Sequence, residues 1–193
     1  MKRGRPREFD AEEVLERGVE FFWTHGYRGA GLTELLKHLG IGRQSFYDSF
    51  GNKREFYQKA IDHYRSTRLA HVLGILQGPG SPLENVRTAV RFFEALARDE
   101  KQRGCFVANA MLEMQSEDDE LRGFLDETMG MLENGYRDAL TKAKKQGELK
   151  AGDPKALARA LTNSSIGLAV TGRLGQSHEV IADIYAGTLA MLR

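Results

Sequence analysis

Apolar residues recur every three to four positions along most of the chain, which is the spacing of helices that bury one face. Ala, Leu, Glu, Lys and Arg are frequent, β-branched runs are few, and the 193 residues include only 4 prolines. The pattern predicts an all-α fold of about nine helices. Their expected ranges are 10–25, 32–39, 43–50, 53–76, 81–98, 104–114, 121–146, 153–174 and 177–192.

Capping residues mark several of these helix ends. Asp10 with Glu13, and Asn52 with Glu55, have the spacing of capping boxes, in which two side chains satisfy free amides at a helix start. Gly26 is expected to end the first helix, because helices commonly stop at a glycine in the left-handed conformation. The helix boundaries near the N-terminus are therefore well marked.

Residues 33–53 carry a short helix, a glycine-punctuated turn and a second short helix. The turn at residues 40–42 lets the two helices cross steeply, with Ile41 expected in the small core between them. Phe46 and Phe50 lie four positions apart and should face inward, which leaves polar side chains on the other faces. This arrangement suits a helix that enters the major groove of DNA. An ordinary solvated helix face is the alternative.

Side chains that suit DNA contacts gather on and after this second helix. Arg43 can pair with guanine and Gln44 with adenine, while the hydroxyls of Ser45 and Tyr47 suit phosphates. Lys53 lies in the first turn of the next helix, where its charge opposes the helix macrodipole. A phosphate bound at that helix start would offset this cost.

The overall charge of +1 does not by itself indicate a nucleic-acid-binding protein. The distribution of charge is more informative, because Arg3, Arg5 and Arg7 precede every acidic residue. Residues 1–8 are therefore interpreted as a basic arm that can reach the phosphate backbone or the minor groove. A solubilising terminus without a partner is the alternative.

The single cysteine excludes an internal disulfide and fits a reducing compartment. The N-terminus is charged, with no apolar segment behind it, and no apolar run approaches the length of a membrane span. We expect a cytoplasmic protein without a membrane partner.

Two further classes of function stay open on the residues alone. One is an all-α enzyme, although the 5 histidines are scattered and no HExxH motif or phosphate loop is present. The other is a helical adaptor or carrier of small molecules without affinity for DNA. Salt-dependent binding to duplex DNA would separate both from a regulator. No cofactor, metal site or catalytic residue is expected.

The N-terminal segment resembles the DNA-binding domain of TetR-family transcriptional regulators. The match runs without gaps from about Phe9 to Phe56, through GRPREFD, FFWTHGYRGAGLTELLKHLGIGRQSFYDSFGNKREF and especially SFYDSFGNK. A second segment, GCFVANAMLEM at 104–114, resembles part of the ligand-binding domain in one branch of the family. The chain departs from the family pattern at Gly31, where a Ser or Thr cap is usual.

The resemblance implies a homodimer whose two recognition helices enter successive major grooves of a palindromic operator in double-stranded DNA. It also implies a larger helical domain that binds a small-molecule inducer, so that the chain divides into the basic arm (1–8), a helix-turn-helix domain (9–54) and a ligand-binding and dimerisation domain (55–193). Repression released by the inducer is the expected mode of action, with activation as the alternative. Besides Arg3, Arg5 and Arg7, the DNA-contacting residues are expected to be Thr33, Gly42, Arg43, Gln44, Ser45, Tyr47 and Lys53. Arg43 and Gln44 occupy variable positions of the family and should set the choice of operator.

The resemblance also implies that the last two helices form the dimer interface with a twofold mate. Both helices offer broad apolar surface, and small residues such as Gly167, Gly172, Ala186 and Gly187 allow close helix approach. One recognition helix alone reads few bases, which favours a dimer. The alternative is that this surface only closes the core of the monomer.

A ligand pocket between helices should be mainly apolar with a few polar groups. Aromatic residues and methionines at helical spacing are candidates to line it, with plain core packing as the alternative. These candidates are Phe92, Phe93, Phe106, Met111, Met114, Phe124, Met129, Met131 and Tyr136.

Three polar or reactive residues complete the ligand candidates. Asn109 lies in an apolar helix, and a buried amide needs partners, which a ligand or a neighbouring helix end can supply. Cys105 follows Gly104 near a helix start, where the macrodipole lowers the pKa of a thiol. Arg173 is expected near enough to favour a thiolate. In some relatives a cysteine of this segment senses electrophiles or oxidants; an inert buried thiol is the alternative.

Overall fold

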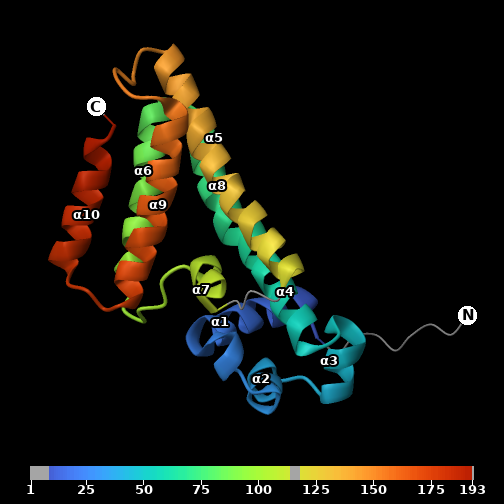
Figure 1. Cartoon of the computed structure of the whole chain (residues 1–193). Coiled ribbons are helices and arrows are strands. Elements are labelled where there is room, and N and C mark those ends of the chain that lie inside the picture. Colours follow the sequence, from blue (N-terminus) through green and yellow to red (C-terminus); the bar gives the residue numbers. More distant parts are fainter. Residues whose placement is uncertain (1–8, 114–117, 193) are drawn as a thin grey trace, which may run out of the picture. The chain divides into compact units, whose positions relative to one another are not determined.

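The computed structural model of the chain describes residues 9–113 and 118–192, in which every regular element is a helix (Figure 1). Arg3, Arg5, Arg7 and Met114 lie outside these ranges. The helices are α1 (Ala11–Gly29), α2 (Leu32–Leu39), α3 (Arg43–Phe50), α4 (Lys53–Tyr64), a π-helical turn η1 (Arg65–Leu69), α5 (Ala70–Gln77), α6 (Pro82–Ala97), α7 (Phe106–Glu113), α8 (Asp119–Lys145), α9 (Pro154–Arg173) and α10 (His178–Ala190).

The all-α prediction is confirmed. Because α4, η1 and α5 follow one another without a gap, the described residues form nine continuous helical segments, which is the number that the apolar pattern predicts. The spacing did not predict the π-helical turn. Within the described ranges, no helix is both long and apolar enough to cross a lipid bilayer.

The chain divides into two compact units, of which the first ends at Ser66 and the second begins at Thr67. In the first unit α1 packs against both α2 and α4, so α4 belongs to this unit by its packing. The division into domains at residue 54 remains a prediction.

Caps form at the predicted helix starts. The Asn52 side chain accepts from the backbone amides of Arg54 and Glu55. The Glu55 carboxylate accepts from the backbone amide of Asn52 at 2.8 Å, which completes a capping box. Asp10 caps α1, whereas the carboxylate of Glu13 pairs with Arg17.

Gly26 interrupts the backbone of α1 where the sequence predicts the helix end. Its φ of 69° and ψ of 168° lie outside the helical region, and one further turn to Gly29 follows. The positive φ suits glycine, because a side chain would crowd the backbone there.

Aromatic rings fill the core of the first unit. The ring of Phe56 on α4 lies 5.0 Å from those of Phe46 and Phe50 on α3 and 6.0 Å from that of Phe22 on α1. Phe46 and Phe50 are buried, as their spacing predicts, whereas Ile41 is only partly buried. The aromatic cluster thus fixes α3 on the unit. A helix of 8 residues needs such packing, because it is not stable in isolation.

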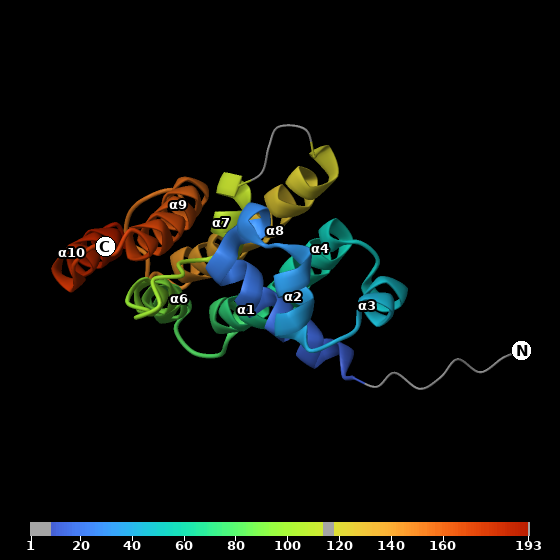
Figure 2. The same ribbon diagram turned by 90° about the horizontal axis from the view of Figure 1, so that it is seen from below.

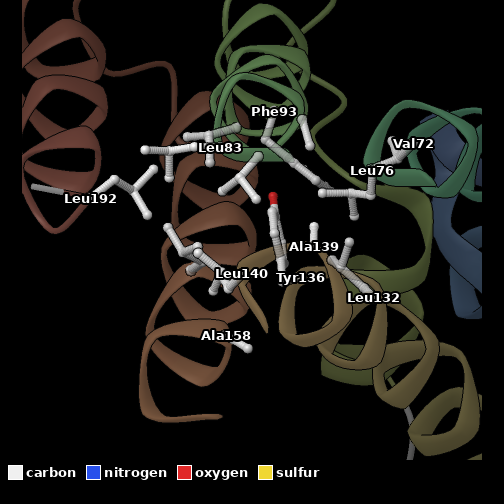
Figure 3. Packing of buried hydrophobic residues seen from close by; sticks show 14 of the residues in the cluster. Val72, Leu76, Leu83, Phe93, Leu132, Tyr136, Ala139, Leu140, Ala158 and Leu192 are labelled. Atoms are coloured by element: carbon white, nitrogen blue, oxygen red, sulfur yellow. The ribbon is translucent and has the colours of Figure 1, made fainter. Parts of the chain in front are cut away.

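In the second unit, α9 packs against both α6 and α8, while α5 packs against α6 and α8 (Figure 1). Their facing side chains form one apolar core, in which the Tyr136 ring of α8 stands among Leu76, Phe93 and Leu132 (Figure 3). The Tyr136 hydroxyl lies 3.0 Å from the Ser165 hydroxyl of α9. Helix α10 packs on α6 and α9, and it runs beside α9 in both views (Figure 1 and Figure 2).

Candidate DNA-contacting surface and ligand region

Helix α3 turns its aromatic residues inward and its polar residues outward. Phe46 and Phe50 are buried, which rotates Arg43, Gln44, Ser45 and Tyr47 to the exposed side of the helix. Gly42 is exposed at the N-cap, and no side chain caps the helix start. Amides at such a start are suited to phosphate oxygens. The structure therefore brings these five predicted DNA-contacting residues onto one short exposed element.

The two candidate base-reading residues differ in how they are held. The amide nitrogen of Gln44 donates to the Asp48 carboxylate at 2.8 Å, one helical turn further along α3. The Arg43 side chain, in contrast, forms no hydrogen bond or ion pair with any residue in 9–113 or 118–192. The Gln44 side chain is thus oriented in the absence of DNA, whereas no contact with the described part of the chain fixes the orientation of the Arg43 guanidinium.

Lys53 is anchored at the start of α4. Its ammonium group donates to the backbone carbonyl oxygen of Tyr27 at 2.6 Å and lies 4.5 Å from the centre of the Tyr27 ring. Burial lowers the pKa of Lys53 below the ordinary lysine value. An ammonium has three N–H donors, so the contact with Tyr27 leaves donors for a phosphate.

Two further cations cap the ends of the helix-turn-helix helices. Arg17 of α1 donates to the carbonyl oxygen of Leu39 at the end of α2, at 3.4 Å. Lys59 of α4 donates to the carbonyl oxygen of Phe50 at the end of α3, at 3.1 Å. Charges of this sign stabilise a helix C-terminus. The sequence analysis missed both residues. The carbonyl that each side chain contacts belongs to another helix, so the local spacing of residues gives no sign of the contact.

Thr33 is exposed on the second residue of α2, after the unusual N-cap Gly31. A Cβ added to Gly31 would lie 1.9 Å from a carboxylate oxygen of Glu34. The Glu34 side chain therefore occupies the space that a Ser or Thr side chain would take at this cap.

The ligand candidates around α7 converge on one backbone carbonyl. The side-chain amide of Asn109 donates to the Arg103 carbonyl oxygen at 2.8 Å, and the guanidinium of Arg173 donates to the same oxygen at 3.3 Å. A Cβ added to Gly104 would lie 2.6 Å from the carbonyl oxygen of Ala169, so this turn seats closely on α9. The buried amide thus finds its partner in the turn before its own helix, and not at the neighbouring helix end that was the alternative to a ligand.

The other ligand candidates take different positions. Cys105 and Phe106 are buried, and Met111 is partly buried on α7. Phe92 lies on α6, where its ring centre is 5.7 Å from that of His71 on α5. The structure therefore brings Asn109 and Arg173 together, and it places Phe92 against α5.

Two buried hydroxyls on α9 are functional candidates that the sequence analysis missed. Ser165 meets Tyr136, as described, and Thr162 lies one turn earlier on α9. The Thr162 hydroxyl is buried without a hydrogen-bond partner among the described residues. The hydroxyls of Thr128, Thr171 and Thr188, in contrast, donate to the carbonyl four residues earlier. The sequence feature that could have revealed these hydroxyls is the presence of polar residues within the apolar stripe of residues 158–172.

A metal site is absent from the part of the chain that the structure describes, where no three His, Cys, Asp or Glu side chains converge.

Comparison with known families identifies both units. The family described as "Bacterial regulatory proteins, tetR family" matches residues 14–60, and "Tetracyclin repressor-like, C-terminal domain" matches residues 82–187. Together with the exposed polar face of α3, these matches define a DNA-binding transcriptional regulator. The chain belongs to the TetR family. Members of this family are regulators and not enzymes, so the enzyme alternative is discarded.

Relatives match over the full length. The uncharacterized HTH-type transcriptional regulator YezE of Bacillus subtilis is 35% identical over 192 residues, which cover 98% of this chain and 99% of YezE. The HTH-type transcriptional repressor ComR of Escherichia coli is 25% identical over 194 residues, covering 98% of this chain and 91% of ComR. A cysteine mutant of the TetR-family regulator CifR, solved with 26-base-pair operator DNA, has a TM-score of 0.87 at 28% identity, covering 98% of this chain and all of that chain.

Proposed function

We propose that the protein is a homodimeric repressor that binds a palindromic operator through α3 of each protomer and is released by an inducer. The observation that carries this proposal is the full-length similarity to CifR, which was solved on operator DNA. The relative ComR is named a repressor, which supports repression as the mode of control. A regulator of this kind acts in the cytoplasm, where bacterial DNA lies.

DNA contacts are assigned to the exposed face around α3. Arg43 and Gln44 read base edges, and Gly42, Ser45 and Tyr47 meet phosphates together with Thr33 and Lys53. The arginines of the basic arm, Arg3, Arg5 and Arg7, add contacts to the phosphate backbone or the minor groove. The aromatic core beneath α3 supports these assignments, because it holds the helix in one orientation.

The dimer is assigned to the outer faces of α9 and α10. Leu174 at the end of α9 and Val180 in the first turn of α10 are 70% and 38% exposed. These apolar side chains are therefore left in contact with solvent in the monomer. A Cβ added to Gly167 on α9 or to Gly187 on α10 would meet nothing within 4 Å. Such open small residues allow the helices of a second copy to approach closely, in a twofold contact that uses the same surface on both protomers.

The inducer site is assigned to the second unit. Charged side chains are absent from the fully buried positions among its described residues, where the buried polar residues are Asn109, Thr128, Thr162, Ser165 and Thr188. An inducer enclosed there is therefore an uncharged molecule with hydrogen-bonding groups, because a buried charge without a partner is costly. Phe92, Phe106, Met111 and Arg173 remain candidates to contact it.

Cys105 is the residue through which an electrophile would act. Alkylation of this thiol would add volume within the tightly seated turn at Gly104, which presses on α9. Cys105→Ser removes the nucleophile, so release of DNA by an electrophile such as N-ethylmaleimide should disappear in this variant. Unchanged release would discard the role of Cys105 and leave only a reversible inducer.

Footprinting of the purified protein on DNA that flanks its own gene tests the proposal. A protected, twofold-symmetric site, together with reduced transcription from the overlapping promoter in vitro, is the expected result. Successive half-sites should lie about 34–36 Å apart, centre to centre. Protection with increased transcription would overturn the repressor assignment, and binding by a monomer would overturn the dimer.

A further inference from the structure

We propose that Asp48 positions the side-chain amide of Gln44 for adenine and against guanine, which makes Asp48 a specificity-determining residue that need not touch a base. This inference rests on the proposed function, because it refines how α3 reads DNA. It assigns a role to the acidic residue on an exposed face that otherwise presents donors to polyanionic DNA.

The hydrogen bond between the two side chains fixes which way the amide points. Gln44 Nε2 donates to Asp48 Oδ1 at 2.8 Å, and both side chains are exposed on α3. An ionised carboxylate only accepts hydrogen bonds, so the nitrogen end of the amide must face it. The oxygen end, Oε1, is therefore directed away from Asp48.

The groups that remain on Gln44 complement adenine. The amide nitrogen has two N–H donors, of which Asp48 occupies one. One N–H and the Oε1 acceptor remain, and this pair matches the N7 acceptor and the N6 donor of adenine in the major groove.

The same bond disfavours guanine. Guanine presents two acceptors, N7 and O6, in the major groove. A glutamine that satisfied both would need both of its N–H donors, and Asp48 has already taken one. Guanine would therefore either leave an acceptor facing Oε1 or break the bond to Asp48.

Two simpler roles for Asp48 make different predictions. A hydrogen bond at this spacing can simply stabilise α3. The negative charge can also simply repel phosphates, which would weaken binding to every duplex alike. Neither role changes which base is preferred at one position.

The variants Asp48→Asn and Asp48→Ala separate these roles. Asn removes the charge and keeps an oxygen that can accept from Gln44, but it also adds N–H donors, whereas Ala removes both the charge and the acceptor. Sites selected from randomised duplexes by the full-length wild-type protein and by each variant give the base preference at every position. Dissociation constants for the selected site, its A·T-to-G·C variants and an unrelated duplex give the magnitudes, and circular dichroism verifies the fold.

We expect both variants to bind unrelated DNA more tightly than the wild type, because both lose the charge. Asp48→Ala should lose about tenfold discrimination between adenine and guanine at one position of each half-site. Asp48→Asn should retain only part of that discrimination, because its side-chain amide can either accept from Gln44 Nε2 or donate to Gln44 Oε1 and so no longer fixes which end of the glutamine amide faces it. In a Gln44→Ala background, the preference should already be lost, and Asp48→Ala should not change it further.

The inference is overturned if Asp48→Ala keeps the wild-type preference at every position, or if Gln44→Ala leaves the preference intact. Failure of the wild-type protein to select any duplex would instead overturn the proposed function. The two failures are therefore distinguishable in one experiment.

Discussion

The ammonium group of Lys53 lies between the backbone and the ring of a single residue, Tyr27, at 2.6 Å from its carbonyl oxygen and 4.5 Å from its ring centre. Tyr27 follows the backbone break at Gly26. A kink in α1 thus places a carbonyl group and an aromatic face where they hold the cation at the start of α4.

Replacing Lys53 tests the proposed phosphate contact. Lys53→Ala should weaken operator binding and lower by about one unit the slope of log affinity against log salt concentration, because one phosphate contact is lost. Fluorescence anisotropy titrations over a range of salt concentrations measure both quantities. Lys142→Ala, which removes an exposed cation from the second unit, is the matched control and should change neither. Equal slopes for the wild type and Lys53→Ala would remove Lys53 from the DNA-contacting surface.

The lowered pKa of Lys53 predicts an alkaline limit to operator binding. Its charge is fully present below its folded-state pKa and is lost as pH rises through that value, earlier than the charge of other lysines. Affinity should therefore begin to fall at a lower pH in the wild type than in Lys53→Arg, whose guanidinium stays charged. Coincident pH profiles of affinity for the two proteins would contradict the assignment.

The open glycines of α9 and α10 allow a test of the dimer that spares the monomer fold. Gly187→Glu should convert the proposed dimer to a monomer, because a charge would enter the proposed interface although the monomer has space for the side chain. Analytical ultracentrifugation measures the mass, and circular dichroism measures helix content. The control is Gly130→Glu on α8, where a Cβ also meets nothing within 4 Å. A Gly187→Glu protein that remains dimeric would place the interface elsewhere.

The hydrogen bond between Tyr136 and Ser165 should contribute to the stability of the second unit. Tyr136→Phe leaves the Ser165 hydroxyl buried without this partner, and we expect a loss of about 1–2 kcal/mol in the free energy of unfolding. Urea denaturation at fixed protein concentration measures it, since the stability of a dimer depends on concentration. With Ser165→Ala, a double-mutant cycle should show coupling; additive losses would show that the two hydroxyls act independently.

The same tyrosine gives stability an alkaline dependence. Burial raises the pKa of Tyr136, so its hydroxyl stays protonated in the folded state at a pH where the unfolded chain ionises. Its contribution to stability is present below about pH 10 and is lost as pH rises above that value. The decline in wild-type stability above this pH should be shallower in Tyr136→Phe.

Local signals allowed much of the fold to be predicted from the sequence. The spacing of Phe46 and Phe50 predicted which face of α3 is buried, and Asn52 with Glu55 predicted the start of α4. Each of these features depends on residues within about one helical turn of one another. Gly26 likewise indicated where α1 breaks, because a positive φ favours glycine.

The contacts that hold the candidate sites depend on residues far apart in the chain. Lys53 and Tyr27 are 26 positions apart, Tyr136 and Ser165 are 29 apart, and Arg173 meets the Arg103 carbonyl across 70. Every residue carries a backbone carbonyl, so no sequence pattern reveals which carbonyl a distant side chain will contact. The bond between Gln44 and Asp48 is different, because its four-residue spacing made it accessible to sequence reasoning.

The role proposed for α3 is that its exposed face reads a specific DNA sequence. It is tested most directly by the ratio of dissociation constants for the footprinted operator and a scrambled duplex, measured at physiological salt for the wild type and for Arg43→Ala/Gln44→Ala. We predict a wild-type preference of at least about a thousandfold for the operator, and its loss in the variant while dimerisation and binding to scrambled DNA persist. An unchanged ratio in the variant, or equal affinity of the wild type for both duplexes, would show that the exposed face of α3 does not read the operator sequence.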